Sequence, residues 1–269
     1  MRNDSIERYR ENILKEGVRR TFSYSRSAKI AYDELSNFIY KKQFKKASDK
    51  MKSLHNKHLG ERCFVIATGP SLNKTNLDLI KDEIKIGINT SFNTGLSFKY
   101  YMISDRVIWD VYSKKLLDLD TTLFLGYVAS RHFFRDKTNE NVYVIKGKNT
   151  SKLPEVFPSD ISENVYVYAK TIVYLALQIL YYLGFSEVYL IGCDCDFSGG
   201  HFDNQKFART SKLQGIEEKE IKHWNSVFDA YRVCKKVFEQ DGRKIINCTV
   251  GGKLEVFERK KLMDVIKNG

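Results

Sequence analysis

The sequence predicts an α/β fold with a mostly parallel sheet and helices on both faces, preceded by an N-terminal helical extension. Between residues 59 and 269, short apolar runs rich in β-branched and aromatic residues alternate with helical patterns. Glycine, proline, asparagine and aspartate gather in the short turns between them. Strands that alternate with helices in this way are typical of parallel sheets, in which each helix crosses from one strand to the next.

The first 58 residues differ from the rest of the chain, and we expect a basic helical extension there. They contain no proline and one glycine, and apolar residues recur at helical spacing from Ile30 to Phe44. The strongly basic stretch from Tyr40 to Lys46 fits either a solvated helix face or peripheral contact with an anionic membrane. Its apolar positions also suit a homo-oligomer. No nucleic-acid-binding motif accompanies the charge, so we expect no nucleic acid partner.

The region from 59 to 269 is expected to form one domain. Its predicted strands, in order, are Cys63–Ala67, Lys85–Ile88, Tyr100–Ile103, Thr122–Leu125, Val142–Ile145, Val188–Ile191 and Lys244–Asn247. Helices are expected at about Asn76–Asp82, Thr171–Leu183 and His223–Gln240, with a helix or loop through Trp109 and Leu117. Gly184 and Gly242 follow two of these helices at the positions where glycine commonly ends a helix.

Composition says more about where in the cell the protein resides than about what it does. The formal net charge of +12 fits nucleic acid, an anionic membrane face or a phosphorylated substrate, and does not choose among them. The five cysteines form no CxxC pair, which favours reduced, buried thiols in a cytosolic protein. The start of the chain has no apolar signal segment, and no run approaches the ~18 apolar residues of a membrane helix. We therefore expect a cytoplasmic protein or one peripheral at the inner membrane face.

Polar residues follow five of the predicted strands, at Thr68-Gly69-Pro70-Ser71, Asn89-Thr90-Ser91, Ser104-Asp105, Asp194-Cys195-Asp196 and Asn247-Cys248-Thr249. In a parallel sheet these positions share the carboxyl edge, where open α/β sheets bind their ligands. Gly69 permits an unusual backbone angle and close approach of a ligand, and Ser71 fits a phosphate contact or a helix cap. The turn matches neither a Walker loop nor GxGxxG.

Amide and carboxylate side chains at this edge suit nucleotide chemistry. Asn89 and Asn247 each donate and accept hydrogen bonds, as recognition of a base or ribose requires, although both also suit plain turns. Asp105, Asp194 and Asp196 fit three roles: metal ligand, ribose contact or general base. The residue types alone leave these roles open.

Two further groups are candidates for phosphate binding and proton transfer. Lys170 and Thr171 precede the apolar helix, where Thr171 fits either a cap or a phosphate grip and Lys170 supplies positive charge. His201 lies in the glycine-rich loop after Asp196, and His223 opens the last long helix. Either histidine suits general acid–base work, and either also fits a structural role.

The segments CFVIATGPSLNKTNLDLIKDE, GINTSF, YYMISD, KTIVYLALQILYYLGFSEVYLIGCDCDFSGGHF and NCTVGGKLEVFER occur in this order between about Gly60 and Arg259. They resemble the MptE-like family, named for an archaeal enzyme that transfers diphosphate from ATP to 6-hydroxymethyl-dihydropterin. The core is also similar to motility accessory factors and to the bacterial sialyltransferases of glycosyltransferase family 42. The resemblance implies a Rossmann-like, nucleotide-sugar-binding domain.

The resemblance to the sialyltransferases implies roles for the strand-end residues. Gly69, Pro70 and Ser71 would border the nucleotide phosphate, and Asn89 would meet the nucleotide or the donor sugar. Asp105 falls where those enzymes place an asparagine.

The same resemblance places Thr171 at a phosphate-contacting helix start. The general base would be His223 or His201, with His223 better matched in position. Three departures bear on the donor: Thr68 replaces an asparagine, Ile172-Val173 replaces Ser-Gly, and Cys195 stands where MptE-like relatives often have histidine.

Together the residues and the resemblance predict a metal-independent glycosyltransferase that requires no cofactor and uses a nucleotide-activated, CMP-linked sugar. Its predicted catalytic residues are His223, His201 and Asp194, and a histidine or the aspartate would deprotonate the acceptor hydroxyl. Its acceptor would be a glycan or lipid-linked molecule of a bacterial surface polysaccharide such as lipopolysaccharide or capsule. One alternative is a pterin diphosphokinase that needs Mg²⁺, held by Asp105 and Asp194. Another is a non-catalytic subunit of a glycan assembly complex.

Overall fold

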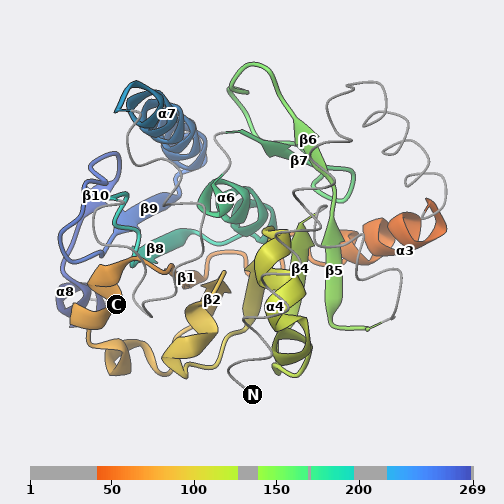
Figure 1. Cartoon of the computed structure of the whole chain (residues 1–269), viewed down its shortest axis with the longest axis horizontal. Coiled ribbons are helices and arrows are strands. Elements are labelled where there is room, and N and C mark those ends of the chain that lie inside the picture. Colours follow the sequence, from red (N-terminus) through yellow and green to blue (C-terminus); the bar gives the residue numbers. More distant parts are fainter. Residues whose placement is uncertain (1–40, 127–138, 169–170, 197–216, 268–269) are drawn as a thin grey trace.

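The computed structural model describes residues 41–126, 139–168, 171–196 and 217–267. In this part of the chain, eight strands form a parallel sheet in the order β10-β9-β8-β1-β2-β3-β4-β5 (Figure 1). Seven of them are the predicted strands: β1 (Arg62–Ile66), β2 (Lys85–Ile88), β3 (Tyr100–Ile103), β4 (Thr122–Gly126), β5 (Val142–Ile145), β8 (Glu187–Ile191) and β9 (Lys244–Asn247). The predicted α/β fold with a parallel sheet is confirmed.

The sequence did not predict three short strands. β6 (Gly147–Asn149) and β7 (Val165–Val167) pair in a separate two-stranded sheet, and β10 (Glu258–Arg259) joins the edge of the main sheet beside β9. Each is only two or three residues long, and a segment that short has no recognisable hydrophobic period.

Two helices at the site match the expectation closely, with one change at a boundary. α6 (Ile172–Leu183) follows Thr171 as its N-cap and ends at Gly184, whose φ of 95° is left-handed. α7 (Glu217–Gln240) begins six residues before the predicted start at His223. His223 therefore lies inside the helix, not at its first turn.

The other helices are shorter. They are α3 (Lys41–Lys52), α4 (Arg106–Leu117), α8 (Leu262–Lys267) and the 3₁₀ turns η1 (Pro70–Lys74), η2 (Leu77–Ile80) and η3 (Ser91–Thr94). The predicted helix at Asn76–Asp82 is only the turn η2, where the Asn76 side chain accepts a hydrogen bond from the Asp78 amide at 3.2 Å.

Helices cover both faces of the main sheet, and each face has its own apolar core. Along β1, Cys63 and Val65 pack with α3, α6 and α7, whereas Phe64 and Ile66 pack with α4, α8 and the 3₁₀ turns. Alternate side chains of a strand point to opposite faces, so one short apolar run serves both cores. The sheet is thereby fixed from both sides, and its strand ends are held in place.

α3 and the turn after it pack against the same core, beside β5 (Figure 1). Met51 and Leu54 are 1% and 3% exposed, and the His58 ring stacks on Phe185 at 4.6 Å. The His58 Nε2 also lies 2.6 Å from the Tyr100 hydroxyl. The expected division at residue 58 thus falls in a segment that contacts the sheet. That division remains a prediction, since residues 1–40 lie outside the described chain.

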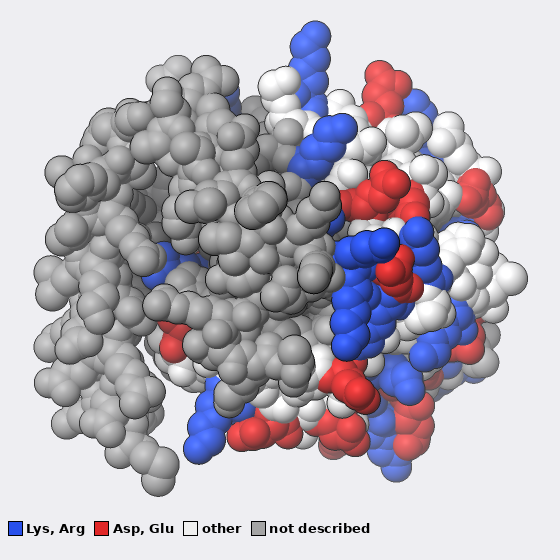
Figure 2. Space-filling view, turned by 90° about the vertical axis from the view of Figure 1, so that its right-hand side faces the viewer, with Lys and Arg blue, Asp and Glu red and all other residues white. Residues whose placement is uncertain are grey.

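The face of the molecule on the side of α3 and β5 carries charges of both signs. Figure 2 shows lysine and arginine interspersed with aspartate and glutamate over the described residues of that face. Among the described helices, none is long and apolar enough to cross a bilayer.

Candidate functional site

The strand order creates a crevice between the carboxyl ends of β1 and β8. From β1 the chain runs outward through β2, β3, β4 and β5, and then returns to place β8 on the other side of β1. Ligands of open α/β sheets bind at such a reversal of strand order. A cavity of about 250 Å³ lies there. Among the predicted site residues, its lining includes Thr68, Gly69, Asn89, Thr171, Asp194, Asp196 and His223.

The other predicted residues lie elsewhere or outside the description. Pro70, Ser71, Asp105 and Asn247 are not among the residues lining this cavity. Lys170 and His201 lie outside the described residues.

Gly69 is needed for space, which corrects the expectation of an unusual backbone angle. Its φ of −68° and ψ of 155° suit any residue. A Cβ at this position, however, would lie 1.8 Å from Oδ2 of Asp194 and 2.6 Å from the carbonyl oxygen of Gly192. The Gly69 amide donates to that same carbonyl at 2.9 Å. The turn after β1 is thus pressed against the end of β8, and only glycine fits.

Asp194 and Ser71 fasten this contact. The Ser71 hydroxyl donates to Oδ2 of Asp194 at 2.7 Å, and the Ser71 amide donates to Oδ1 at 3.2 Å. Both residues are buried, at 7% and 4% exposed. Asp194 therefore holds the Gly-Pro-Ser turn in position, and Ser71 faces this carboxylate, not the cavity.

The turn after β2 presents Asn89 to the cavity. Asn89 adopts a left-handed conformation with φ of 51°, which asparagine tolerates better than most residues. The Tyr101 hydroxyl fixes this turn: it donates to the Asn89 carbonyl at 2.8 Å and accepts from the Phe92 amide at 2.8 Å. The ring fits because position 87 is glycine, where a Cβ would lie 2.1 Å from the Tyr101 ring.

The N-terminus of α6 forms another wall. Thr171, Ile172 and Val173 line the cavity. The Thr171 side chain makes no capping hydrogen bond to its own helix, and its hydroxyl lies 3.1 Å from the hydroxyl of Tyr231 in α7. The first amides of a helix carry partial positive charge and lack intrahelical partners, so this wall suits an anion such as phosphate.

α7 forms a further wall of the cavity, with mostly aromatic side chains. His223, Trp224, Val227 and Tyr231 line it, at the three- and four-residue spacing of one helix face. Trp224 stacks with Phe228 one turn later, with ring centroids 5.8 Å apart. This wall combines an apolar surface with one imidazole.

Two cysteines line the cavity but do not suit nucleophilic chemistry. Burial raises the pKa of the Cys193 thiol well above its usual value and raises the pKa of Cys195 to about 12. Because the thiolate is the nucleophile, both groups are unreactive near neutral pH.

The remaining polar candidates have structural partners. Asp196 lies 3.6 Å from the Lys253 ammonium. Asp105 is the N-cap of α4 and accepts from the Val107 amide at 2.7 Å. The Asn247 amide donates to the Leu254 carbonyl at 2.8 Å and its oxygen accepts from the Thr249 amide at 3.0 Å, so it orders the turn after β9. No group of three or more histidine, cysteine, aspartate or glutamate side chains that would hold a metal ion occurs within the described ranges.

Sequence reasoning missed three residues that shape the site: Trp224, Tyr231 and Tyr101. The first two were detectable, since they lie on the same helix face as His223. Tyr101 gave no signal, because a tyrosine in an apolar strand is indistinguishable from a core residue.

A comparison with curated protein sequences finds no match. One similar solved structure is the sialyltransferase CstII from Campylobacter jejuni, in complex with a substrate analogue, cytidine-5'-monophosphate. It has 12% sequence identity and a TM-score of 0.44, and the alignment covers 75% of this chain and 85% of that one. Residues 36–200 match the family model described as 6-hydroxymethylpterin diphosphokinase MptE-like. This match spans more than half of the chain, and the protein belongs to the MptE-like family.

Proposed function

We propose that the protein is a glycosyltransferase that binds a nucleotide-activated sugar in the crevice between β1 and β8. One observation carries the proposal: the Gly69 turn, the Asn89 turn, the α6 N-terminus and His223 all border one cavity at the reversal of strand order. Such a crevice is where α/β sheets bind nucleotides.

Different walls of the cavity suit different parts of the donor. The amides at the start of α6 suit the phosphate that links nucleotide to sugar, and they stabilise the charge that this phosphate gains as it leaves. Asn89, held by Tyr101, suits the base or ribose because its side chain both donates and accepts. Lys170 and His201 remain predicted contributors.

His223 is the proposed general base. It removes the proton from the acceptor hydroxyl as that oxygen bonds to the anomeric carbon and the nucleotide phosphate departs with the bonding electrons. Asp194, whose carboxylate is held by Ser71, acts as a positioning residue for the phosphate-binding turn. This assignment differs from the catalytic role expected for Asp194 from sequence.

The surroundings of the carboxylates favour metal-independent transfer. Asp194 is bonded to Ser71, Asp196 pairs with Lys253, and Asp105 caps α4. A Mg²⁺ site would need carboxylate oxygens turned toward the donor phosphates. The second candidate is nevertheless a Mg²⁺-dependent pterin diphosphokinase, which the description of the matched family favours. A non-catalytic role in glycan assembly remains the third.

The resemblance to the sialyltransferase motifs points to a CMP-linked donor and a glycan or lipid-linked acceptor in surface polysaccharide synthesis. Peripheral membrane contact through residues 1–58, and a location at the inner membrane face, remain predictions.

A thermal-shift panel with CMP, CDP, UDP, GDP and ATP, each with and without Mg²⁺, tests the donor. A ligand at 100 times its Kd stabilises the folded protein by about 2.7 kcal/mol, which is roughly 5–10 °C for a chain of this size. We expect CMP to stabilise the protein equally with and without Mg²⁺. Stabilisation by ATP only with Mg²⁺ would favour the diphosphokinase, and no stabilisation by any nucleotide would overturn both enzymatic proposals.

A further inference from the structure

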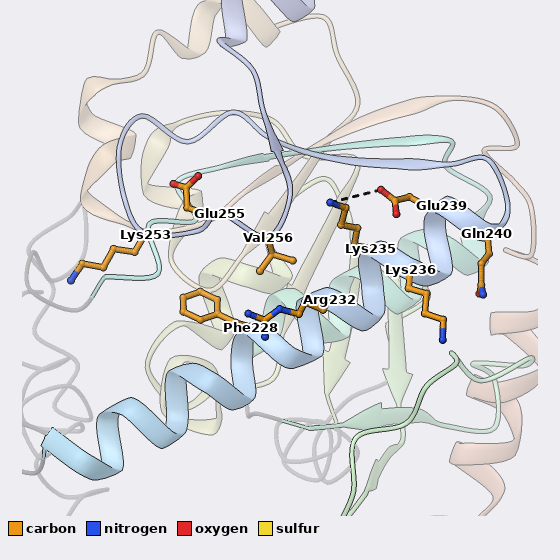
Figure 3. A pocket seen from close by; sticks show the side chains of 9 residues that line it. All are labelled: Phe228, Arg232, Lys235, Lys236, Glu239, Gln240, Lys253, Glu255 and Val256. Atoms are coloured by element: carbon orange, nitrogen blue, oxygen red, sulfur yellow. Dashed lines mark ion pairs between the residues drawn. The ribbon is translucent and has the colours of Figure 1, made fainter.

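A second and larger hollow, of about 740 Å³, lies between α7 and the segment Lys253–Val256 (Figure 3). We call it the α7 groove. Its positive side chains are Arg232, Lys235, Lys236 and Lys253, and its apolar ones are Phe228 and Val256. Figure 3 shows Phe228 and Arg232 on α7 opposite Val256 of the segment. None of these residues belongs to the predicted site.

The groove is positive overall. Its lining contains these four cations and two carboxylates, Glu239 and Glu255. Glu255 pairs at 2.8 Å with Arg259, which is not part of the lining. The Lys235 ammonium is 4.0 Å from Glu239. Arg232 pairs with Asp229 at 2.6 Å, but the two side chains are 63% and 52% exposed, so both ion pairs are solvated and contribute little. Anionic groups of a ligand therefore find accessible cations.

Residues of the groove contact residues of the crevice. Lys253 belongs to the groove, its ammonium lies 3.6 Å from Asp196, and its amide donates to the Asp194 carbonyl at 2.7 Å. On α7, Phe228 of the groove stacks with Trp224 of the crevice. The groove and the crevice are therefore neighbours along α7.

We infer that the α7 groove binds the anionic part of the acceptor, a sugar chain that carries carboxylate or phosphate groups. Arginine and lysine bind such groups with charge-assisted hydrogen bonds. Glu239 and Gln240 accept hydrogen bonds from sugar hydroxyls, and Phe228 supplies an apolar wall. A flat membrane surface would not enter a hollow of this kind. The inference rests on the proposed function, since it names the substrate class of the same site.

The test uses the full chain and two probes of equal length, tetragalacturonate and the neutral maltotetraose, in calorimetric titrations at low and high salt. We expect tetragalacturonate to bind, and to bind more weakly in salt because the cations are exposed. The double variant Arg232→Glu/Lys235→Glu should lower the affinity for tetragalacturonate at least tenfold. The matched control, Lys57→Glu/Lys99→Glu, makes the same charge change at two exposed lysines near the amino ends of the strands, and should change affinity less than twofold.

Equal binding of both sugars, equal weakening by both double variants, or no binding of tetragalacturonate would each overturn the inference. The inference would also be overturned if the protein bound phosphatidylglycerol vesicles and Arg232→Glu/Lys235→Glu abolished that binding but left tetragalacturonate binding unchanged. CMP affinity is measured in parallel on every variant. If Arg232→Glu/Lys235→Glu loses sugar binding but keeps CMP binding, the result supports the groove as the acceptor site. If CMP binds neither the unaltered protein nor any variant while sugar binding is intact, only the proposed donor is contradicted.

Discussion

The carboxylate of Asp194 accepts two hydrogen bonds from Ser71, across 123 residues of sequence. It joins the end of β8 to the turn after β1, the two strands on either side of the reversal in strand order. The site is thereby built by backbone turns that buried polar contacts hold in place. Its shape depends on residues that no ligand needs to touch.

The first prediction concerns this pair. Asp194→Ala should lower the free energy of unfolding by about 1–3 kcal/mol, because the buried Ser71 amide and hydroxyl lose their acceptor. Ser71→Ala should cost less, and the double variant should show a coupling energy of about 0.5–3 kcal/mol in urea denaturation. Asp196→Ala is the control, since its ion pair is partly exposed and should contribute at most about 1 kcal/mol. Strictly additive effects would show that the two residues do not act together.

The second prediction concerns the space at Gly69. Gly69→Ala should abolish stabilisation by CMP, because the new methyl group displaces the turn from Asp194 and Gly192. Gly251→Ala is the matched control: its φ is 72° and no atom lies within 4 Å of the added Cβ. That change should cost about 1–2 kcal/mol of stability through the left-handed backbone, yet preserve the CMP response. A normal CMP shift in Gly69→Ala would contradict the close contact.

The sequence was sufficient for seven of the eight strands of the main sheet and for the edge that carries the cavity. Its apolar runs marked seven strands, and their polar ends marked the Gly69, Asn89 and Asp194 turns. Which polar residues turn inward was not predictable. Asp105 and Asn247 have the same residue types and strand-end positions as the cavity residues, but each bonds to nearby backbone. Side-chain direction depends on packing, which a linear pattern does not contain.

The third prediction tests the Tyr101 hydroxyl separately from the packing of its ring in the apolar core. Tyr101→Phe keeps the ring but removes the hydroxyl that holds the Asn89 carbonyl and the Phe92 amide. We expect CMP affinity to fall about tenfold, which corresponds to about 1.4 kcal/mol. Tyr143→Phe, on β5, should leave CMP affinity unchanged. Retained affinity in Tyr101→Phe would show that the Asn89 turn keeps its shape without this hydroxyl.

The fourth prediction uses the thiols. Burial raises the pKa of all five cysteines, to about 12 for Cys195 and Cys248, so at pH 8 they are protonated and poor nucleophiles. Native protein should therefore react with less than about one equivalent of a thiol reagent over minutes, and unfolded protein with five. Raising the pH toward 12 should accelerate the reaction. Rapid labelling of the native protein at pH 8 would contradict the burial of Cys63, Cys193, Cys234 and Cys248 and the raised pKa of the half-buried Cys195.

The fifth prediction tests the proposed base. His223→Gln and His223→Ala should each lower kcat by about 10²- to 10⁴-fold, the usual contribution of a general base, while CMP affinity changes little. In the unaltered protein the rate should fall in acid, because a protonated imidazole cannot accept the acceptor proton, and this acid limb should vanish from the residual activity of His223→Gln. His55→Gln, at an exposed position after α3, serves as the control and should keep both rate and pH profile. If His223→Gln turns over at the normal rate, the base lies elsewhere, and His201 becomes the next candidate.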